Sequence, residues 1–264
     1  MFAFVRAVSP RLAACELTHL ARAPIDVPRA AAQHAAYCAV LAEAGCTVCD
    51  LPPLPDAPDA VFVEDTALLL DGHAIITRPG ASSRAAETPS VAATVAAHFI
   101  VHELPAGQLE GGDVLRIGRT LFVGETTRTD EAGIAALRAC TAPLGFTVRK
   151  VAVGACLHLK TGVTYLGNDG NGRATLLLNP GWIDPGVFAD LGTLAVLPVD
   201  AAEPWAANTL RVHDTLLLPA GNRRTQTRLV ALGFKVRVVD ISELQKAEAG
   251  LTCMSLLGAP TAAV

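Results

Sequence analysis

Residues 144–151, LGFTVRKV, and residues 232–239, LGFKVRVV, are nearly the same sequence. Each copy follows a stretch with helical spacing of apolar residues and itself alternates between apolar and polar residues. This is the pattern of a helix that leads through a glycine into a strand. Two close copies in one chain indicate an internal repeat. We therefore predict that the fold is built from copies of one small unit.

The same unit can be traced through most of the chain. Segments in which a turn separates two apolar runs lie at 61–80, 109–125, 157–181, 206–221 and, in shortened form, 250–258. Helices are predicted over 28–44, 88–99, 130–144 and 222–232, whereas 182–196 holds a short helix at best. Each unit then consists of two strands, a helix and a third strand. The first strand, FAFVRAV (2–8), belongs to no complete unit, and we expect it to complete the last unit and close a ring without exposed sheet edges.

A chemically distinctive side chain stands where the first strand of each unit begins. These positions recur at intervals of 45 to 50 residues and hold Glu64 with Asp65, Glu110 with Asp113, His158, Asn208 and Cys253. A pseudo-symmetric array would bring them to one axis. Alone, Cys253 and His158 would each be explained more simply as buried core residues, but the shared register favours one pocket of acids, imidazole and thiol.

The composition limits the class of protein. The 264 residues are 51% hydrophobic and 17% charged, with a formal net charge of −4. This balance predicts a large core and argues against a general binder of nucleic acid or anionic membrane. No apolar run reaches the roughly 18 residues needed to span a bilayer, and no signal peptide is recognisable. We expect a cytoplasmic protein with one catalytic domain over residues 1–264, whose seven cysteines are reduced thiols.

The residue types at the repeated position indicate a substrate class. A thiol becomes a useful nucleophile beside a partner that favours the thiolate, and His158 is the candidate partner of Cys253. Several carboxylates nearby suit a planar cation held in fork geometry, such as a guanidinium. Arg84 and Arg128 follow the first two hairpins and could bind a substrate carboxylate, although isolated arginines there are usually solvated. A substrate with a cationic group at one end, for the acids, and a carboxylate at the other, for the arginines, is most simply an amino acid.

At this point the sequence resembles a known family. The strings PDAVFVEDTA, AIITRPGASSR, LEGGDVL, FVGETTRT, LHLKTG, AAN and GLTCMSL occur in the same order in dimethylarginine dimethylaminohydrolases, which belong to the pentein, or guanidino-group-modifying, superfamily. The resemblance covers residues 1 to 258. It implies an α/β fold, a five-bladed propeller of ββαβ units, and hydrolysis of Nω-methylated arginine to citrulline and a methylamine.

The resemblance also implies residue roles. Cys253 would be the nucleophile, His158 the general acid and base, and Glu110 the acid that orients the imidazole and contacts the guanidinium. Asp65 would hold the guanidinium with support from Glu64. The remaining implied substrate contacts are the pocket wall Phe62, the amino-group acid Asp59, the carboxylate pair Arg84 and Arg128, and the backbone carbonyl of Ala247. A leucine carbonyl from the first loop belongs to the pattern as well, and either Leu12 or Leu17 could supply it.

The expected partners and the alternatives complete the sequence-based hypothesis. The implied chemistry requires neither a metal nor an organic cofactor, and the expected ligand is a small methylated arginine, with a homodimer as one possible assembly. One alternative is a deiminase or related hydrolase acting on arginine, agmatine or another amidino compound. An alternative from another class is a non-catalytic protein that binds guanidino ligands. The role of Asn208 stays open between participation and satisfying backbone groups beside the pocket.

Overall fold

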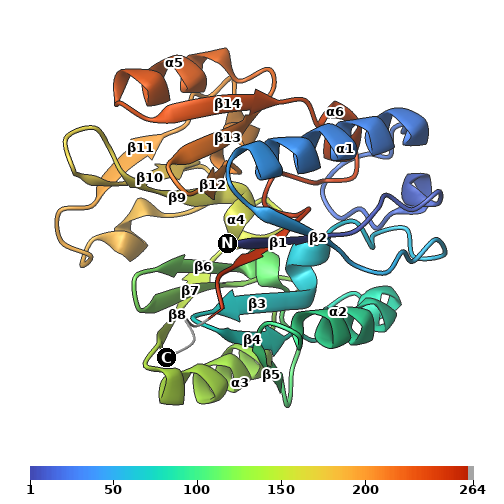
Figure 1. The fold of residues 1–264 in the computed structure, drawn as a ribbon. Coiled ribbons are helices and arrows are strands. Elements are labelled where there is room, and N and C mark those ends of the chain that lie inside the picture. Colours follow the sequence, from blue (N-terminus) through green and yellow to red (C-terminus); the bar gives the residue numbers. More distant parts are fainter. Residues whose placement is uncertain (261–264) are drawn as a thin grey trace.

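The computed structural model describes residues 1–260, and within them the strands form five three-stranded sheets (Figure 1). In every sheet two strands form an antiparallel pair, which is a hairpin in four of the sheets, and one strand of the pair also pairs in parallel with a third strand. Four sheets follow chain order and contain β3 (Ala67–Leu70), β4 (His73–Ile76) and β5 (Ile100–Glu103); β6 (Val114–Ile117), β7 (Thr120–Glu125) and β8 (Thr147–Ala152); β9 (Val163–Asn168), β10 (Ala174–Leu178) and β11 (Ala195–Pro198); and β12 (Leu210–Val212), β13 (Thr215–Pro219) and β14 (Lys235–Val239).

The fifth sheet joins the two ends of the described chain. It contains β1 (Phe2–Val5) between β15 (Leu256–Gly258), with which it pairs in antiparallel fashion, and β2 (Thr47–Asp50), with which it pairs in parallel. The prediction that the N-terminal strand completes the last unit is therefore confirmed. The strand is shorter than the predicted 2–8, because Arg6 leaves the pairing and its buried guanidinium donates to the carbonyl oxygens of Pro52 and Ala60.

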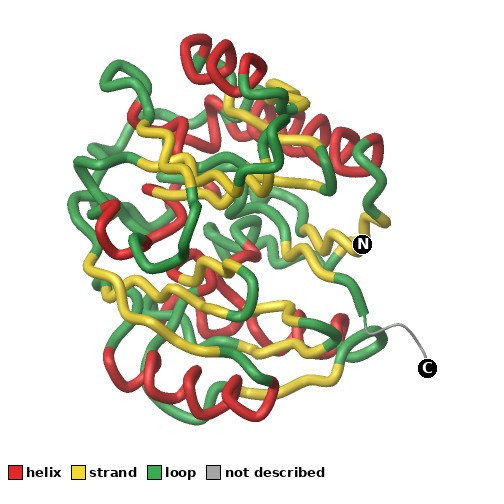
Figure 2. The backbone as a smooth tube through the Cα atoms, turned by 90° about the vertical axis from the view of Figure 1, so that its left-hand side faces the viewer, coloured by secondary structure: helices red, strands yellow, loops and turns green. Residues whose placement is uncertain are grey.

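The helices lie close to their predicted positions. They are α1 (Val27–Glu43), α2 (Thr88–Val95), α3 (Glu131–Thr141), α5 (Arg223–Ala231), and the single turns α4 (Leu159–Gly162) and α6 (Ser242–Gln245). The segment predicted to hold a short helix at best contains only a 3₁₀ turn, Pro185–Phe188. Figure 2 shows helices above and below and strands between them, an α/β arrangement in which the apolar strand residues face buried clusters. No helix within residues 1–260 combines the length and apolar character needed to cross a membrane.

Helix α1 illustrates how the sequence sets these boundaries. Asp26 caps its start by accepting a hydrogen bond from the backbone N–H of Arg29 at 3.0 Å, and Pro28 occupies the first turn. Its buried face includes Ala30, Tyr37 and Leu41, at helical spacing. Gly45 follows with a φ of 93°, a conformation that glycine adopts without strain, and the chain then enters β2. Packing of this one face fixes the helix against the β1 sheet.

The residues at the repeated position lie within or directly beside short helical turns, and each turn precedes the first strand of its sheet. The turns are the 3₁₀ helices Val63–Thr66, Gly111–Asp113 and Pro204–Ala207, the helix α4, and the turn at 251–254. Neighbouring turns contact one another, since Val63–Thr66 contacts Gly111–Asp113 and α4 contacts both Gly111–Asp113 and Pro204–Ala207. The repeated position thus converges in space, as the register predicted.

Candidate active site

Cys253 lies in the turn before β15 and is 9% exposed. Its Sγ accepts a hydrogen bond from the backbone N–H of Gly250 at 3.3 Å, and its carbonyl oxygen accepts from the N–H of Glu64 at 3.0 Å. Burial raises the pKa of the thiol to about 12, and the negative charges of Glu64 and Asp65 add to the rise. In the unliganded pocket the sulfur is therefore a neutral thiol at neutral pH.

His158 stands at the N-terminus of α4 and faces Glu110 and Asp65. Its Nε2 lies 2.7 Å from Glu110 Oε2 and 3.9 Å from Asp65 Oδ1. Burial lowers the pKa of the imidazole, but Asp65, Asp113 and Glu110 outweigh it and raise the pKa to about 9. Gly112 makes this packing possible, because a Cβ there would lie 2.6 Å from His158 Nδ1. The site thus holds a protonated imidazole at neutral pH.

Asp65 and Arg84 form a buried ion pair beside the imidazole. Arg84 Nη1 lies 2.5 Å from Asp65 Oδ2, and the same guanidinium donates to Glu87 through Nε and Nη2 and to the carbonyl oxygen of Phe62 at 2.7 Å. Burial raises the pKa of Asp65, but His158 and Arg84 outweigh it and the net pKa is lowered. Asp65 is therefore a carboxylate at neutral pH. Arg84, predicted to meet a substrate carboxylate, has its donors engaged by Asp65, Glu87 and Phe62 and acts here to fix Asp65.

Arg128 and Asp59 lie under the first loop. Arg128 Nη1 is 3.6 Å from Glu110 Oε1, and its Nη2 donates to Thr18 Oγ1 at 3.3 Å. The Asp59 carboxylate accepts from the backbone N–H of Glu16 at 3.2 Å. Burial raises the pKa of Asp59 to about 6, against the opposing effects of Arg84 and the Glu16 N–H. Both side chains therefore bind the part of the first loop that covers the pocket, at Glu16 and Thr18. We call this part of the loop the roof of the pocket.

The first loop also separates the two candidate leucines. Leu12 is fully buried in the core cluster under α1, within the 3₁₀ turn Leu12–Ala14. Leu17 is only partly buried and stands between Glu16, which lines the pocket, and Thr18, which accepts from Arg128. The geometry favours Leu17 as the leucine that belongs to the roof.

A single small cavity connects most of the predicted residues. Its volume is about 20 Å³, and it is lined by Glu16, Asp59, Phe62, Asp65, Arg84, Glu110, Arg128, Leu157, His158, Ala247, Glu248, Ala249 and Cys253. Nine of the ten predicted site residues are among them. A ligand pocket normally offers roughly 300 Å³ or more. The structure is therefore a closed form, and a ligand of amino-acid size requires the roof to move.

Glu64 is the tenth predicted residue, and the structure directs its side chain elsewhere. Its carboxylate lies 2.5 Å from Lys160 Nζ and accepts from Thr252 Oγ1 at 2.7 Å, and none of these three side chains lines the cavity around Cys253. The predicted contact of Glu64 with substrate is therefore corrected: adjacent residues in the 3₁₀ turn Val63–Thr66 point in different directions, so Asp65 faces the imidazole and Glu64 faces away.

Asn208 contacts the nucleophile turn rather than the cavity. Its Oδ1 accepts from the backbone N–H of Thr252 at 3.1 Å, and its Nδ2 donates to Thr252 Oγ1 at 3.2 Å. Thr252 precedes Cys253 and also donates to Glu64. The fourth repeated position therefore binds both the backbone and the side chain of the residue next to the thiol, which goes further than the satisfaction of backbone groups considered from the sequence.

Comparisons with known proteins extend these observations. No protein-family model matches the chain. The N(G),N(G)-dimethylarginine dimethylaminohydrolase of Streptomyces coelicolor is 40% identical over 256 residues, covering 96% of this chain and 95% of that protein. The chain belongs to the dimethylarginine dimethylaminohydrolase family. The Pseudomonas aeruginosa member is 35% identical over 88% of this chain and 89% of its own length.

Solved structures of dimethylarginine dimethylaminohydrolases have the same fold as this chain. A cysteine-to-serine mutant of the Pseudomonas aeruginosa protein in complex with citrulline superimposes with a TM-score of 0.89 at 33% identity, covering 97% of this chain and 98% of that one. The N-terminal domain of a cyanobacterial arginine dihydrolase superimposes with a TM-score of 0.79 at 20% identity over 98% of this chain, which shows the likeness of fold alone.

Asp113 has a role that the repeat did not predict. Asp113 accepts from the hydroxyls of Thr126 and Thr129 at 2.7 Å each and from the Leu159 N–H at 2.9 Å, so it anchors the start of α4 and is not part of the cavity wall.

Asp65, Glu110 and His158 offer ligand atoms within 4.8 Å of one another. A cation there would require a neutral imidazole, whereas His158 is protonated at neutral pH.

Sequence reasoning missed four residues with clear contacts. Lys160 pairs with Glu64, Thr252 joins Glu64 to Asn208, Glu87 captures Arg84, and Glu248 accepts from three backbone N–H groups of the first loop. Two of them had a signal, since Glu87 follows Arg84 at the i,i+3 spacing of a helical ion pair and Lys160 follows His158 in the repeated position. Glu248 and Thr252 had none, because their partners lie far away in the chain.

Proposed function

We propose that this protein hydrolyses Nω-methylated arginine, such as asymmetric dimethylarginine or monomethylarginine, to citrulline and dimethylamine or methylamine. The observation that carries the proposal is the convergence of a buried thiol, an imidazolium and two carboxylates on one cavity, in a chain 40% identical to a dimethylarginine dimethylaminohydrolase. The citrulline complex of a relative supports the same product class. The expected ligand is thus a small guanidino compound.

The carboxylates suit a guanidinium as the ligand. Glu110 and Asp65 both lie near Nε2 of the imidazole, at 2.7 Å and 3.9 Å, and Phe62 adds an apolar wall. A bound cation would compensate the negative charge of Asp65 and Glu64, which otherwise raises the thiol pKa. Binding would therefore lower the pKa of Cys253 and favour its thiolate at the moment when a target carbon is present. Binding of a cationic ligand would therefore activate the nucleophile.

The thiolate then attacks the guanidinium carbon and forms a C–S bond. His158, protonated at neutral pH, gives its proton to the departing amine, and the C–N bond breaks to leave a covalent thiouronium. The neutral imidazole next accepts a proton from water as that water attacks the same carbon. The C–S bond breaks, the sulfur leaves as thiolate, and citrulline is released. The thiol proton leaves to solvent when the ligand binds, the second proton of the attacking water leaves to solvent as the carbonyl forms, and the released amine takes up a proton in solution. No further reactant is needed.

We further propose that the five sheets are arranged as a five-bladed propeller around the site. Contacts between first strands of successive sheets support this arrangement, since β15 contacts β3, β6 contacts β9, and β9 contacts β12. The nucleophile and the imidazole would then stand at the axis, where each blade contributes one short turn.

The deciding experiment is an assay of citrulline release with purified protein. Asymmetric dimethylarginine, monomethylarginine, arginine and agmatine are compared, with Cys253→Ser as the matched control. We expect release from the methylated arginines, faster than from arginine or agmatine, and none with Cys253→Ser, which should still bind methylarginine. The preferred release of citrulline from arginine would favour a deiminase, and binding without release from any compound would favour a guanidino-binding protein. Full activity of Cys253→Ser would refute the assignment of the nucleophile.

A further inference from the structure

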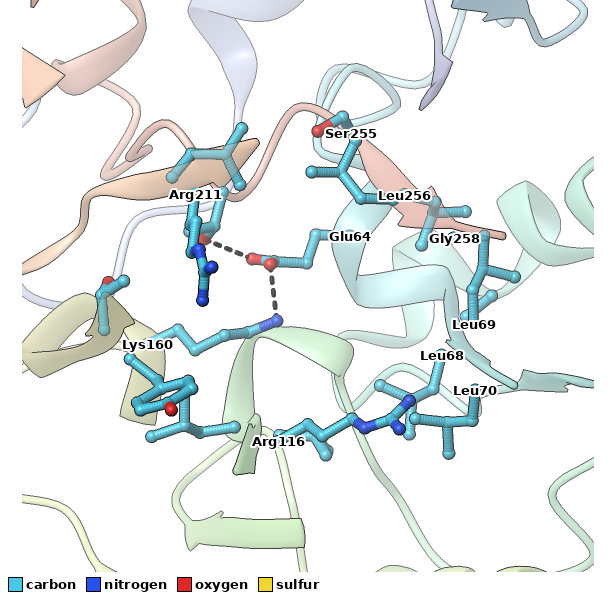
Figure 3. Close-up of a pocket in the computed structure, with 18 of the residues that line it drawn as sticks. Glu64, Leu68, Leu69, Leu70, Arg116, Lys160, Arg211, Ser255, Leu256 and Gly258 are labelled. Atoms are coloured by element: carbon cyan, nitrogen blue, oxygen red, sulfur yellow. Dashed lines mark hydrogen bonds and ion pairs between the residues drawn. The ribbon is translucent and has the colours of Figure 1, made fainter. Parts of the chain in front are cut away.

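A second and larger cavity lies behind the nucleophile turn. Its volume is about 450 Å³, within the usual range for small-molecule pockets, and its wall includes Glu64, Lys160 and Thr252 (Figure 3). Their sequence neighbours Asp65 and Cys253 line the cavity of the proposed active site instead. The two cavities therefore share a wall one residue thick. We call this second space the rear cavity.

Not every charged side chain of the rear cavity has a partner of opposite charge. Both of its carboxylates already have cationic partners: Glu64 pairs with Lys160, and Asp71 pairs with Arg116 and Arg119. Arg211 differs, because within residues 1–260 its guanidinium has no carboxylate partner and its Nε donates to the carbonyl oxygen of His213 at 3.0 Å. Three cationic side chains thus face two carboxylates, and one positive charge remains without compensation.

The backbone leaves room for Arg211 in this position, and the His213 carbonyl binds it. Gly167, at the end of β9, has a φ of 83° and no side chain, and a Cβ there would collide with the Arg211 guanidinium. The bond from Nε to the His213 carbonyl leaves the two terminal nitrogens of the fork for another acceptor. Arg211 and Lys160 both line the rear cavity (Figure 3). Two cationic groups are therefore available to one ligand in this cavity.

The rest of the wall is mostly apolar. Leucines from four sheets line it, namely Leu68, Leu69, Leu70, Leu115, Leu210, Leu256 and Leu257. A phosphate or a sulfate would leave this surface in contact with water, whereas an alkyl chain would cover it at a gain of about 25 cal/mol per Å² of apolar area removed from water. A carboxylate matches the Arg211 fork in bidentate geometry.

We propose that the rear cavity is a second ligand site, which takes a small carboxylate with a short alkyl body, the carboxylate on Arg211 and Lys160 and the chain against the leucines. This site goes beyond the proposed hydrolase activity, since none of the residues that would bind the carboxylate lines the cavity around Cys253. A ligand bound there leaves the methylarginine site open and does not compete with it. Its carboxylate shares Lys160 with Glu64, the residue whose backbone N–H binds the Cys253 carbonyl.

Calorimetric titration of the intact protein with sodium hexanoate tests the site. Hexylammonium chloride reverses the charge of the probe, and sodium acetate removes its alkyl chain. The variants are Arg211→Gln, with Arg173→Gln as the matched control, because Arg173 is likewise an exposed arginine whose Nε donates to a backbone carbonyl, that of Thr193, but lies outside the rear cavity. Arg128→Gln reports on binding in the cavity around Cys253. Circular dichroism confirms that each variant is folded.

We expect hexanoate to bind wild type and Arg173→Gln alike, to bind Arg211→Gln at least tenfold more weakly, and to be unaffected by Arg128→Gln. Hexylammonium and acetate should bind at least tenfold more weakly than hexanoate. Equal affinity in wild type and Arg211→Gln, or loss of binding in Arg128→Gln alone, would overturn the proposal, as would the absence of any hexanoate binding. All of these readouts are independent of turnover, so they stand whether or not the protein hydrolyses methylarginine.

Discussion

At the scale of single residues, the groups around Cys253 fix one another's charge states. The acids Asp65, Asp113 and Glu110 keep His158 protonated. Burial, with a further contribution from Glu64 and Asp65, raises the pKa of the Cys253 thiol and keeps it neutral. Burial alone would leave the imidazole neutral, so the acids decide its state. The pair therefore rests as thiol and imidazolium, and an incoming cation is what changes the balance.

The elevated imidazole pKa makes stability depend on pH. Its folded value of about 9 exceeds the ordinary 6.5, so the stabilisation is complete below pH 6.5 and is lost as the pH rises through about 9. We expect the difference in unfolding free energy between wild type and His158→Gln to shrink by roughly 3 kcal/mol over this window, at about 1.4 kcal/mol per pKa unit. Urea denaturation at pH 6, 7.5 and 9.5 measures it. A difference that stays constant across the three pH values would contradict the charged imidazolium.

Asn208 gives a second prediction at this scale. Because its amide holds Thr252 at both the N–H and the hydroxyl, Asn208→Ala should let the nucleophile turn shift, and misplacement by about 1 Å costs up to 100-fold in rate. We expect kcat to fall about tenfold or more while KM changes little, since Asn208 does not line the cavity around Cys253. Asn179→Ala is the matched control, a buried asparagine that donates to the Pro204 carbonyl. Steady-state kinetics and the alkylation rate of Cys253 measure the effect, and equal kinetics in both variants would refute it.

At the scale of elements, the short turns carry the site, and the sequence predicts their positions better than their side-chain directions. The hairpins, helices and register follow from local patterns, and the repeated position was assigned from spacing alone. The direction of each side chain depends on which turn, from a distant part of the sequence, lies opposite it in the folded protein. Glu64 faces away from the imidazole because Lys160 and Thr252, from two other units, receive it, and Arg84 is fixed by Glu87 before any ligand arrives. The i,i+3 spacing indicates the pair of Arg84 and Glu87, whereas no local pattern indicates that Glu64 binds Lys160 and Thr252.

The first loop is the element most open to test. Glu248 accepts from the backbone N–H groups of Thr18, His19 and Leu20, and this one carboxylate fastens the roof over a cavity too small for a ligand. Removal of the carboxylate leaves these three N–H groups without their acceptor, at a cost on the order of 1–3 kcal/mol for each one that stays buried and unpaired. We expect Glu248→Ala to raise KM about tenfold and to expose the loop to trypsin after Arg22.

Limited proteolysis followed by mass spectrometry, together with steady-state kinetics, measures this change. Glu43→Ala is the control, because Glu43 pairs with Arg237 on the surface, far from the loop. Cleavage after Arg22 at the same rate in wild type and Glu248→Ala would show that the carboxylate does not fasten the roof.

At the scale of the whole molecule, the β1 sheet links the two ends of the described chain. Phe4 is fully buried and packs its ring against Phe99 at a centroid distance of 6.1 Å. We expect Phe4→Ala to destabilise the protein by about 3–5 kcal/mol, the usual cost of emptying such a position. Ile100→Ala, at an apolar side chain 59% exposed, should cost less than about 0.5 kcal/mol. Urea denaturation compares the two, and similar costs would show that β1 does not hold the sheet together.

The pairing of β1 with β15 also has a consequence for the order of synthesis. The nucleophile turn precedes β15 directly, and β15 finds its partner in β1, which is synthesised long before it. Until the segment that ends at Gly258 emerges, β1 waits beside β2 with one edge bare, and the imidazole, the acids and the arginines are present without a sulfur to attack. The growing polypeptide therefore acquires its reactive centre in one late step, when the edge is covered. A polypeptide that ends before Cys253 lacks the proposed nucleophile, so we expect it to release no citrulline.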